Sequence, residues 1–332
     1  MKVLVTGGGG FLGRGIVAAL RERGDDVRSL ARSEYPELAK LGVEPIRGDI
    51  ADAEAVAAAV EGCDLVFHVA ARVGAAGDYD EFHATNVVGT QNIIDACRKH
   101  GVSKLVYTST PSVVFGHDDL EGVDESAPYA TDYEAFYPQT KAEAERLVLA
   151  ASGDGLHTVS IRPHIVWGPG DTSLLPRLLE RAPRLRRIRG PAKKTDVTFI
   201  DDAVRAHVLA ADRLGEEPDA VSGKAYFVST GEPIEIWTFI DRVLQAAGRP
   251  TITKTAPAGL ALAAGWVFEK IHAMTGASGE PRLSRWIVRE LTRSHWFDIS
   301  AARRDLGYQP TVTIDEGMRR LTQWVQDGGL PS

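Results

Sequence analysis

Short apolar runs alternate with helical patterns along the first half of the chain. The helical patterns place apolar residues three and four positions apart, and cover Gly13–Arg23, Ala53–Glu61 and Asn86–His100. The strand-like runs between them are Val3–Thr6, Val27–Leu30, Glu44–Arg47, Leu65–Val69, Lys104–Thr108 and Thr158–Ile161. Strands and helices in this order are typical of βαβ units. We therefore expect an α/β fold with a Rossmann-type, doubly wound parallel sheet.

The pattern changes after Arg162, where Pro and Gly residues interrupt the chain up to Pro169. A strand at Ala225–Val228 is expected to return to the main sheet, and the sequence beyond Gly231 is mainly helical. We therefore predict two interleaved parts. Residues 1–165 plus 196–230 would form a dinucleotide-binding domain, and residues 166–195 plus 231–332 a smaller, mainly helical substrate-binding lobe.

The charge balance bears on the partners that the chain can bind. The formal net charge of the 332 residues is -7, so we expect no nucleic-acid partner. The one basic stretch, Arg177–Arg189, alternates Arg with Leu and Ile. This pattern favours an amphipathic helix followed by a strand with a solvated face, and leaves an anionic substrate or an acidic membrane surface as alternatives.

Two further stretches bear on location. Met1–Val5 runs directly into a glycine motif and leaves no room for a signal peptide, which predicts a cytoplasmic protein. The longest apolar run, Ala256–Phe268, is shorter than the ~20 residues of a spanning helix, so it can only contact a membrane peripherally or roof an apolar pocket. Cys63 and Cys97 lack metal-ligand spacing, so we expect buried thiols and no metal.

Three glycines after the first strand predict a cofactor site. Gly7, Gly10 and Gly13, with Phe11 and Leu12 between them, follow a strand and open a helix. Glycines there allow a tight turn and let backbone amides approach a pyrophosphate, which the helix N-terminus stabilises. A glycine-rich turn without a ligand is the alternative.

The ends of the next strands predict which dinucleotide binds. An NAD site normally has a carboxylate after the second strand, whereas this chain has Arg32 and Ser33, which can hold a 2′-phosphate. We therefore expect NADP(H) in preference to NAD(H). Asp49, followed by Ile50, either accepts from the adenine amino group or caps the next helix. The small Ala70 and Ala71 let the cofactor lie against the backbone.

The hydroxyl of Thr110, the phenol of Tyr137 and the ammonium of Lys141 are candidates for a set of catalytic groups. Tyr137 and Lys141 are four residues apart, hence on one face of a helix, where the ammonium would favour the phenolate. Thr110 follows the fifth strand, at the sheet edge where a nicotinamide would lie. Ser109 and Ser112 compete for the role of Thr110, and hydroxyls that only cap a turn are the alternative.

These motifs together resemble the extended short-chain dehydrogenase/reductases over almost the whole chain. The matching segments are Gly7–Gly13, Gly48–Asp49, Asn86–Thr90, the Thr110/Tyr137/Lys141 set, Arg162–Pro163, Gly168–Gly170 and Phe199–Asp202. Within that superfamily the chain is similar to the 3β-hydroxysteroid dehydrogenase group. Phe136–Lys141, Arg162–His164 and Ile236–Phe239 resemble sterol-4α-carboxylate 3-dehydrogenases, whereas Tyr35–Leu38, Tyr107–Val113, Trp167–Asp171 and Ser294–Trp296 resemble bacterial 2-alkyl-3-oxoalkanoate reductases.

The resemblance implies hydride transfer at a carbon β to a carboxylate on a hydrophobic molecule. Thr110 and Tyr137 would bind the 3-oxygen, with Lys141 assisting, although family members more often carry Ser at the position of Thr110. Pro163 would contact the cofactor and Ser112 the substrate. His164, Arg162 and Arg177 are candidates to bind the carboxylate, with a structural role as the alternative for each. A homodimer through the helices that contain Asn86 and Tyr137 is also implied.

Three other functions compete. A nucleotide-sugar epimerase shares the cofactor motifs, but the apolar run Ala256–Phe268 and the tryptophan-rich tail suit an aliphatic or steroidal ligand better. A 4,6-dehydratase would carry Asp-Glu where Pro111 and Ser112 stand. A non-enzymatic nucleotide sensor would be expected to lack Tyr137 or Lys141, and both are present.

Overall fold

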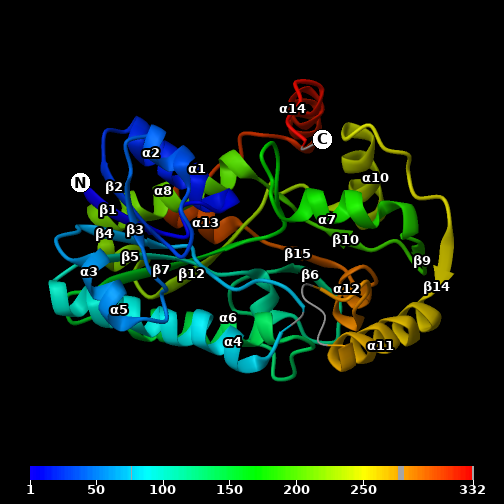
Figure 1. Cartoon of the computed structure of the whole chain (residues 1–332), viewed down its shortest axis with the longest axis horizontal. Helices are drawn as coiled ribbons and strands as arrows, with labels where there is room; N and C mark the ends of the chain where they lie inside the picture. The colour runs from blue at the N-terminus through cyan, green and yellow to red at the C-terminus, as the bar shows by residue number, and fades with distance from the viewer. Residues whose placement is uncertain (76, 276–279, 331–332) are drawn as a thin grey trace.

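The main sheet of the protein has seven parallel strands. A computed structural model describes residues 1–75, 77–275 and 280–330. The strand order is β12-β7-β5-β4-β1-β2-β3 (Figure 1). The strands are β1 Lys2–Thr6, β2 Asp26–Ala31, β3 Glu44–Arg47, β4 Leu65–His68, β5 Lys104–Thr108, β7 His157–Pro163 and β12 Lys224–Val228. The order reverses between β1 and β4, which confirms the doubly wound Rossmann-type fold and the return of the strand near residue 225.

Helices cover both faces of this sheet. α1 (Phe11–Glu22) packs with α8 (Ile200–Glu216) on one face, and α3 (Ala53–Val60), α5 (Gly89–His100) and α6 (Phe136–Ala150) cover the other (Figure 1). Val3, Leu4 and Val5 of β1 are fully buried between the two layers. Strands buried on both faces explain why the apolar runs are continuous rather than alternating. All seven strands therefore end at one edge, above which a ligand can lie.

The α-helix expected over Asn86–His100 begins only at Gly89. A π-helical turn at Ala84–Val88 directly precedes α5, and α4 (Tyr79–His83) runs into that turn. The side chain of Asn86 bonds to Arg72 O at 3.1 Å and to Thr140 Oγ1 at 3.0 Å. Asn86 thus connects the loop after β4 to α6, and π turns are frequent at functional sites.

A second, smaller sheet lies beside the main one and was not expected. Its order is β13-β10-β15-β6, with β6 at Leu120–Val123, β10 at Lys194–Thr195, β13 at Ile234–Glu235 and β15 at His295–Phe297. β6 belongs to the first half of the chain, yet it pairs with β15 near the C-terminus. The loop after β5 is thereby fixed against the C-terminal region.

Helices dominate the rest of the C-terminal half. They are α10 (Ile236–Ala246), α11 (Ala258–Thr275), α12 (Arg285–Glu290), α13 (Ser300–Leu306) and α14 (Ile314–Gln326). The basic stretch forms α7 (Leu174–Arg181), a 3-10 turn at Ala182–Arg184 and β9 (Arg187–Arg189), which is a helix followed by a strand as expected. β9 pairs with β14 (Thr255–Pro257). The other short elements are α2 (Pro36–Lys40), β8 (Val166–Trp167), β11 (Thr198–Phe199), α9 (Pro218–Val221) and a 3-10 turn at Pro111–Val114.

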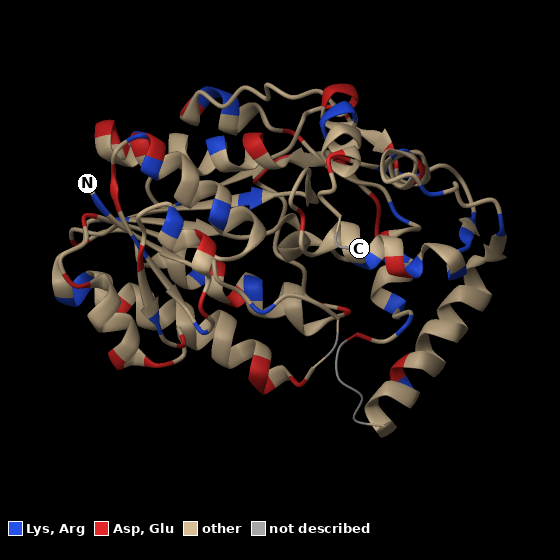
Figure 2. Ribbon diagram, turned by 45° about the horizontal axis from the view of Figure 1, so that its top comes forward, with Lys and Arg blue, Asp and Glu red and all other residues tan. Residues whose placement is uncertain are grey.

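The apolar run expected at 256–268 lies in β14 and α11. Acidic and basic residues are sparse on α11 (Figure 2), and its large exposed apolar residues are Leu260, Trp266, Val267, Ile271 and Met274. Within the described parts of the chain, no helix combines the length and the apolar character needed to cross a bilayer.

Candidate active site

A cleft of about 360 Å³ lies at the carboxyl ends of the main-sheet strands. It gathers most of the residues predicted to bind a dinucleotide: Gly7, Gly10, Phe11, Leu12, Gly13, Arg32, Ser33, Asp49, Ile50, Ala70, Ala71, Tyr137 and Lys141. These residues come from the ends of four strands and from two helices, α1 and α6, that are distant in sequence. Pro163 is not among the lining residues. It ends β7, where it is buried and pairs with Val228.

The glycine loop fits a cofactor because its conformation leaves no room for side chains. Gly7 has φ +69, and a Cβ there would lie 2.9 Å from Ala70 Cα. A Cβ on Gly13 would lie 2.2 Å from the carbonyl oxygen of Gly7. α1 then begins at Phe11 with no side-chain cap and no acidic residue in its first turn. Its free amides therefore face the cleft and can bind an anion such as a pyrophosphate.

The adenosine end of the cleft is formed by the ends of β2 and β3. Arg32 and Ser33 are both exposed at the cleft. Asp49 Oδ1 accepts only a local bond, from the amide of Ala51 at 3.0 Å. The cap of α3 is Asp52, which accepts from the amides of Glu54 and Ala55. The alternative that Asp49 caps this helix is therefore wrong.

A buried chain of hydrogen bonds holds the cleft wall in place at the end of β4. The sequence analysis did not predict it. Thr90 Oγ1 donates to Asn86 O at 2.6 Å, so it accepts from His68 Nε2 at 2.9 Å. His68 Nδ1 then accepts from Thr6 Oγ1 at 2.8 Å, and Thr6 Oγ1 accepts from the amide of Ala70. Burial lowers the pKa of His68 to about 3, which keeps the ring neutral. The neutral ring matches the donor and acceptor roles of this chain.

The predicted catalytic residues lie near one another, and two of the three line the cleft. Tyr137 and Lys141 lie one turn apart on α6, and both line the cleft. Thr110 precedes the 3-10 turn after β5 and is not among the residues that line the cleft. Its hydroxyl lies 3.0 Å from Ser112 Oγ and accepts from the amide of Ser112 at 3.2 Å, and it is close enough to the Tyr137 phenol to affect its pKa. Lys141 Nζ donates to Thr108 O at 2.6 Å and lies 4.1 Å from the centre of the Tyr107 ring. The buried Ser109 also lines the cleft.

Burial changes the proton affinity of both α6 side chains. It raises the pKa of Tyr137 to about 12, against the opposing effect of the Thr110 hydrogen bond. It lowers the pKa of Lys141 to about 7, against the opposing charge of Glu145. The expectation that Lys141 lowers the pKa of Tyr137 is not met, because the effect of burial dominates and the Lys141 ammonium donates to the carbonyl oxygen of Thr108. With a pKa of about 12, the Tyr137 phenol is protonated at neutral pH.

Glu145 extends this row of residues by one further turn, and the sequence analysis missed it. Tyr137, Lys141 and Glu145 are spaced by four, hence on one helix face. The Glu145 side chain is 0% exposed and accepts from Arg162 Nη2 at 2.6 Å and from Ser160 Oγ at 2.7 Å. A carboxylate placed four residues after a lysine, in an otherwise apolar pattern, was the signal available in the sequence.

The three cations expected to bind a substrate carboxylate are each paired inside the protein. Arg162 forms the buried ion pair with Glu145. His164 Nδ1 lies 2.7 Å from Asp196 Oδ1, where both side chains are buried. Arg177 lies 3.0 Å from Glu280. These pairs support the structural alternative for Arg162 and His164, whereas binding of a substrate carboxylate by any of the three stays a prediction.

Comparison with known proteins places the chain in a family. The profile described as the 3-beta hydroxysteroid dehydrogenase/isomerase family matches residues 4–256. The chain belongs to this family. A 2-alkyl-3-oxoalkanoate reductase of Stenotrophomonas maltophilia is 47% identical over 325 residues, which is 97% of this chain and 98% of the relative. A 3 beta-hydroxysteroid dehydrogenase/Delta 5→4-isomerase of Mycobacterium tuberculosis is 37% identical over 336 residues, which is 96% of this chain and 88% of the relative.

Solved structures share the fold of this family member. MoeE5 in complex with UDP-glucose and NAD has a TM-score of 0.75 and 26% identity, with 99% of each chain covered. The resemblance to the 3β-hydroxysteroid dehydrogenase group and the Rossmann-type fold expected from the sequence are both confirmed.

Proposed function

We propose that the chain is a nicotinamide-dependent oxidoreductase that interconverts a 3-hydroxy and a 3-oxo group on a hydrophobic substrate. The first candidate substrate is a 2-alkyl-3-oxoalkanoate, and the second is a 3β-hydroxysteroid or sterol carboxylate. The observation that carries the proposal is that Tyr137 and Lys141 line the glycine-lined cleft, with Thr110 close enough to the Tyr137 phenol to affect its pKa. The family and the 47% identical reductase support the same reaction class.

Each catalytic side chain has a distinct role in this proposal. Thr110 Oγ1 and Tyr137 Oη hold the substrate 3-oxygen, since the Thr110 hydroxyl lies close enough to the Tyr137 phenol to lower its pKa. The bound nicotinamide supplies or accepts the hydride. During reduction the proton that reaches the new hydroxyl comes from Tyr137. Lys141, as an ammonium, stabilises the phenolate that remains and binds the nicotinamide ribose.

At neutral pH Tyr137 has the protonation state from which reduction starts. A phenol with a pKa of about 12 is protonated and ready to donate, whereas the oxidation of a hydroxyl needs its deprotonated form. The name of the 47% identical relative supports the same direction.

The preference for NADP(H) rests on Arg32 and Ser33. Both side chains are exposed at the cleft after β2, where they can bind a 2′-phosphate through charge-assisted hydrogen bonds. NAD(H) remains the second candidate, because MoeE5 holds NAD in the same fold.

One assay tests the reaction and its alternative. The absorbance of NADPH and of NADH is followed with 2-alkyl-3-oxo acids, 3-oxosteroids and UDP-sugars. We expect the 3-oxo acids to oxidise the cofactor fastest. Conversion of a UDP-sugar without net cofactor oxidation would support a nucleotide-sugar epimerase instead. No change with any 3-oxo compound would contradict the proposed reaction.

The structure also bears on the division of the chain into two parts, on its cellular location and on its assembly. We propose that residues 1–165 plus 196–230 bind the cofactor, and that 166–195 plus 231–332 contribute the substrate site. The exposed apolar side chains of α11 support peripheral contact with a lipid surface. The two free, buried cysteines support a reducing compartment such as the cytoplasm. A homodimer through α5 and α6 rests on the family resemblance, and measurement of the mass in solution tests it.

A further inference from the structure

The two candidate catalytic hydroxyls lie on segments that little regular structure connects. Thr110 precedes the 3-10 turn at Pro111–Val114, and Tyr137 is the second residue of α6. Between them the chain forms only the short strand β6, and residues 124–135 form neither helix nor strand. α6 also begins without a side-chain cap and without an acidic residue in its first turn. Contacts from elsewhere in the chain must therefore fix the position of Thr110 relative to Tyr137.

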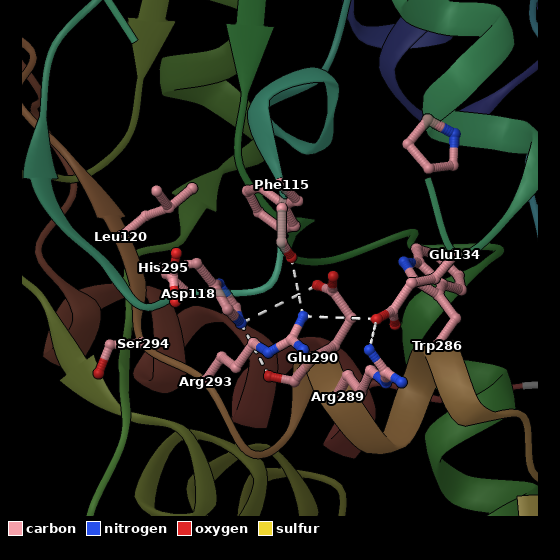
Figure 3. A pocket seen from close by; sticks show the side chains of 12 residues that line it. Phe115, Asp118, Leu120, Glu134, Trp286, Arg289, Glu290, Arg293, Ser294 and His295 are labelled. Carbon is pink, nitrogen blue, oxygen red and sulfur yellow. Dashed lines mark hydrogen bonds and ion pairs between the residues drawn. The ribbon is translucent and has the colours of Figure 1, made fainter. Parts of the chain in front are cut away.

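A small cavity marks the place where such contacts converge. It measures about 20 Å³ and lies between the loop after β5, the start of α6 and the region of α12 and β15 (Figure 3). Its wall includes Gly116 from the loop, Glu134 and Pro138 at the start of α6, and Arg289 and Arg293 from the C-terminal region. The cavity has room for little more than one water molecule, so the polar groups on its wall bond to one another.

One nitrogen of Arg293 bridges the two catalytic segments. Arg293 Nη1 donates to Gly116 O at 2.8 Å and lies 3.6 Å from Glu134 Oε1 (Figure 3). Gly116 lies just after the 3-10 turn that follows Thr110. Glu134 is three residues before Tyr137. A single guanidinium therefore holds the segment that carries Thr110 against the segment that leads to Tyr137.

Other contacts support this bridge. Arg289 of α12 pairs with the same carboxylate oxygen of Glu134. The side chains of Arg293 and Glu134 are 23% and 16% exposed, so solvent screens their attraction less than that of a fully exposed pair. Tyr133 Oη donates to Val113 O at 3.0 Å and so joins the same two segments. The pairing of β6 with β15 places Arg293 beside both of them.

We propose that Arg293, supported by Arg289, is a positioning residue that holds the Thr110 hydroxyl in place beside the Tyr137 phenol. This inference rests on the proposed function, in which these two hydroxyls bind the substrate 3-oxygen together. Arg293 acts through the backbone of the two segments and not by contact with the substrate. A displacement of about 1 Å between groups that bind one reacting atom can cost about 10²-fold in rate. The bridge thus connects the proposed substrate-binding lobe to the catalytic hydroxyls.

Hydrogen exchange tests the bridge without any substrate. Arg293→Met removes the charge and the donors but keeps a long side chain. We expect amides in peptides covering residues 108–117 and 130–137 to exchange about threefold faster or more in this variant, with peptides of β1 unchanged. Arg285→Met is the matched control, since Arg285 lies on α12 and pairs with Glu269 at 2.8 Å. Its exchange should match that of the native protein. Unchanged exchange of both segments in Arg293→Met would overturn the bridge.

A double-mutant cycle tests whether Arg293 acts through Thr110. We expect Arg293→Met to lower kcat for a 2-alkyl-3-oxo acid by about tenfold or more, with less than about twofold change in the dissociation constant of NADPH. In the Thr110→Val variant the same change should lower kcat by less than about twofold further, because the hydroxyl that it positions is already absent. Arg293→Lys, which keeps one charged nitrogen, should lose less activity than Arg293→Met. Fully additive losses would overturn the positioning role.

Glu134→Gln removes the other side of the ion pair and should change exchange and kcat in the same direction. It covers the case in which Arg293→Met fails to fold, and thermal melting verifies the folding of each variant. Faster exchange in Arg293→Met, without turnover of any 3-oxo compound by the native protein, would support the bridge and contradict the proposed reaction instead.

Discussion

Glu145 lies one helical turn beyond Lys141 on α6, and its buried carboxylate opposes the loss of the lysine's positive charge. Burial alone favours the neutral amine, and the resulting pKa of Lys141 is about 7. Arg162 in turn holds Glu145 ionised, because the guanidinium lowers the pKa of that carboxyl against the effect of burial. A buried ion pair behind the lysine therefore helps to determine whether the lysine is charged at neutral pH.

Glu145→Gln is expected to lower the pKa of Lys141 below about 7. Since the ammonium is the form proposed to assist catalysis, the alkaline decline of kcat should move to lower pH. The variant also leaves Arg162 buried without its partner, which costs about 3–5 kcal/mol of stability. The measurement is a pH profile of kcat, taken well below the melting temperature of the variant.

Glu143→Gln is the control for this effect, because it removes the same charge from a half-buried site on the same helix. Its pH profile should match that of the native protein. An unchanged profile for Glu145→Gln in a folded variant would contradict the electrostatic link and leave the ion pair a purely structural role.

Tyr137→Phe should abolish turnover while the cofactor still binds. The ring fills the same space, but the proton donor is lost, and general acid catalysis is worth about 10²–10⁴-fold in rate. Titration of NADPH fluorescence measures binding, and stopped assays measure the residual rate. Thr110→Ser, which keeps the hydroxyl, should retain most activity, whereas Thr110→Val should not. Near-normal turnover by the phenylalanine variant would reject the proton-donor role.

Arg32→Ala should weaken NADPH binding by about tenfold or more and change NADH binding by less than about twofold. The expected contrast arises because only NADPH carries the 2′-phosphate that the guanidinium would bind. Dissociation constants for both nucleotides, measured at low and moderate salt, test this, since a charge-dependent contact weakens as salt increases. Equal effects on the two nucleotides would show that Arg32 does not select the cofactor.

The sequence predicted the main sheet because its strands are buried on both faces and read as continuous apolar runs, as in Val3–Val5. The glycine motif and the Tyr137/Lys141 spacing are local patterns, so they too were readable. The sheet containing β6 and β15 could not be predicted. Strands of three or four residues carry little pattern, and these two pair across 170 or more residues.

The rise in the Tyr137 pKa, and which arginines are free to bind a ligand, could not be predicted from the sequence either. Each depends on groups brought together only by folding. Arg162 looked available for substrate in the sequence, yet Glu145 from a neighbouring helix neutralises it. Arg293, which directly precedes the Ser294–Trp296 segment, reaches the cavity beside α6 because β15 pairs with β6.

Gly13→Ala should abolish cofactor binding and destabilise the protein. The added Cβ would lie 2.2 Å from the carbonyl oxygen of Gly7, a backbone atom that cannot move without displacing the loop or α1. Overpacking of this kind costs about 1–3 kcal/mol. Gly190→Ala is the matched control, because nothing lies within 4 Å of its Cβ position. Nucleotide titration and thermal melting measure both effects. A variant at position 13 that melts earlier yet binds NADPH with native affinity would separate the helix packing from the pyrophosphate site.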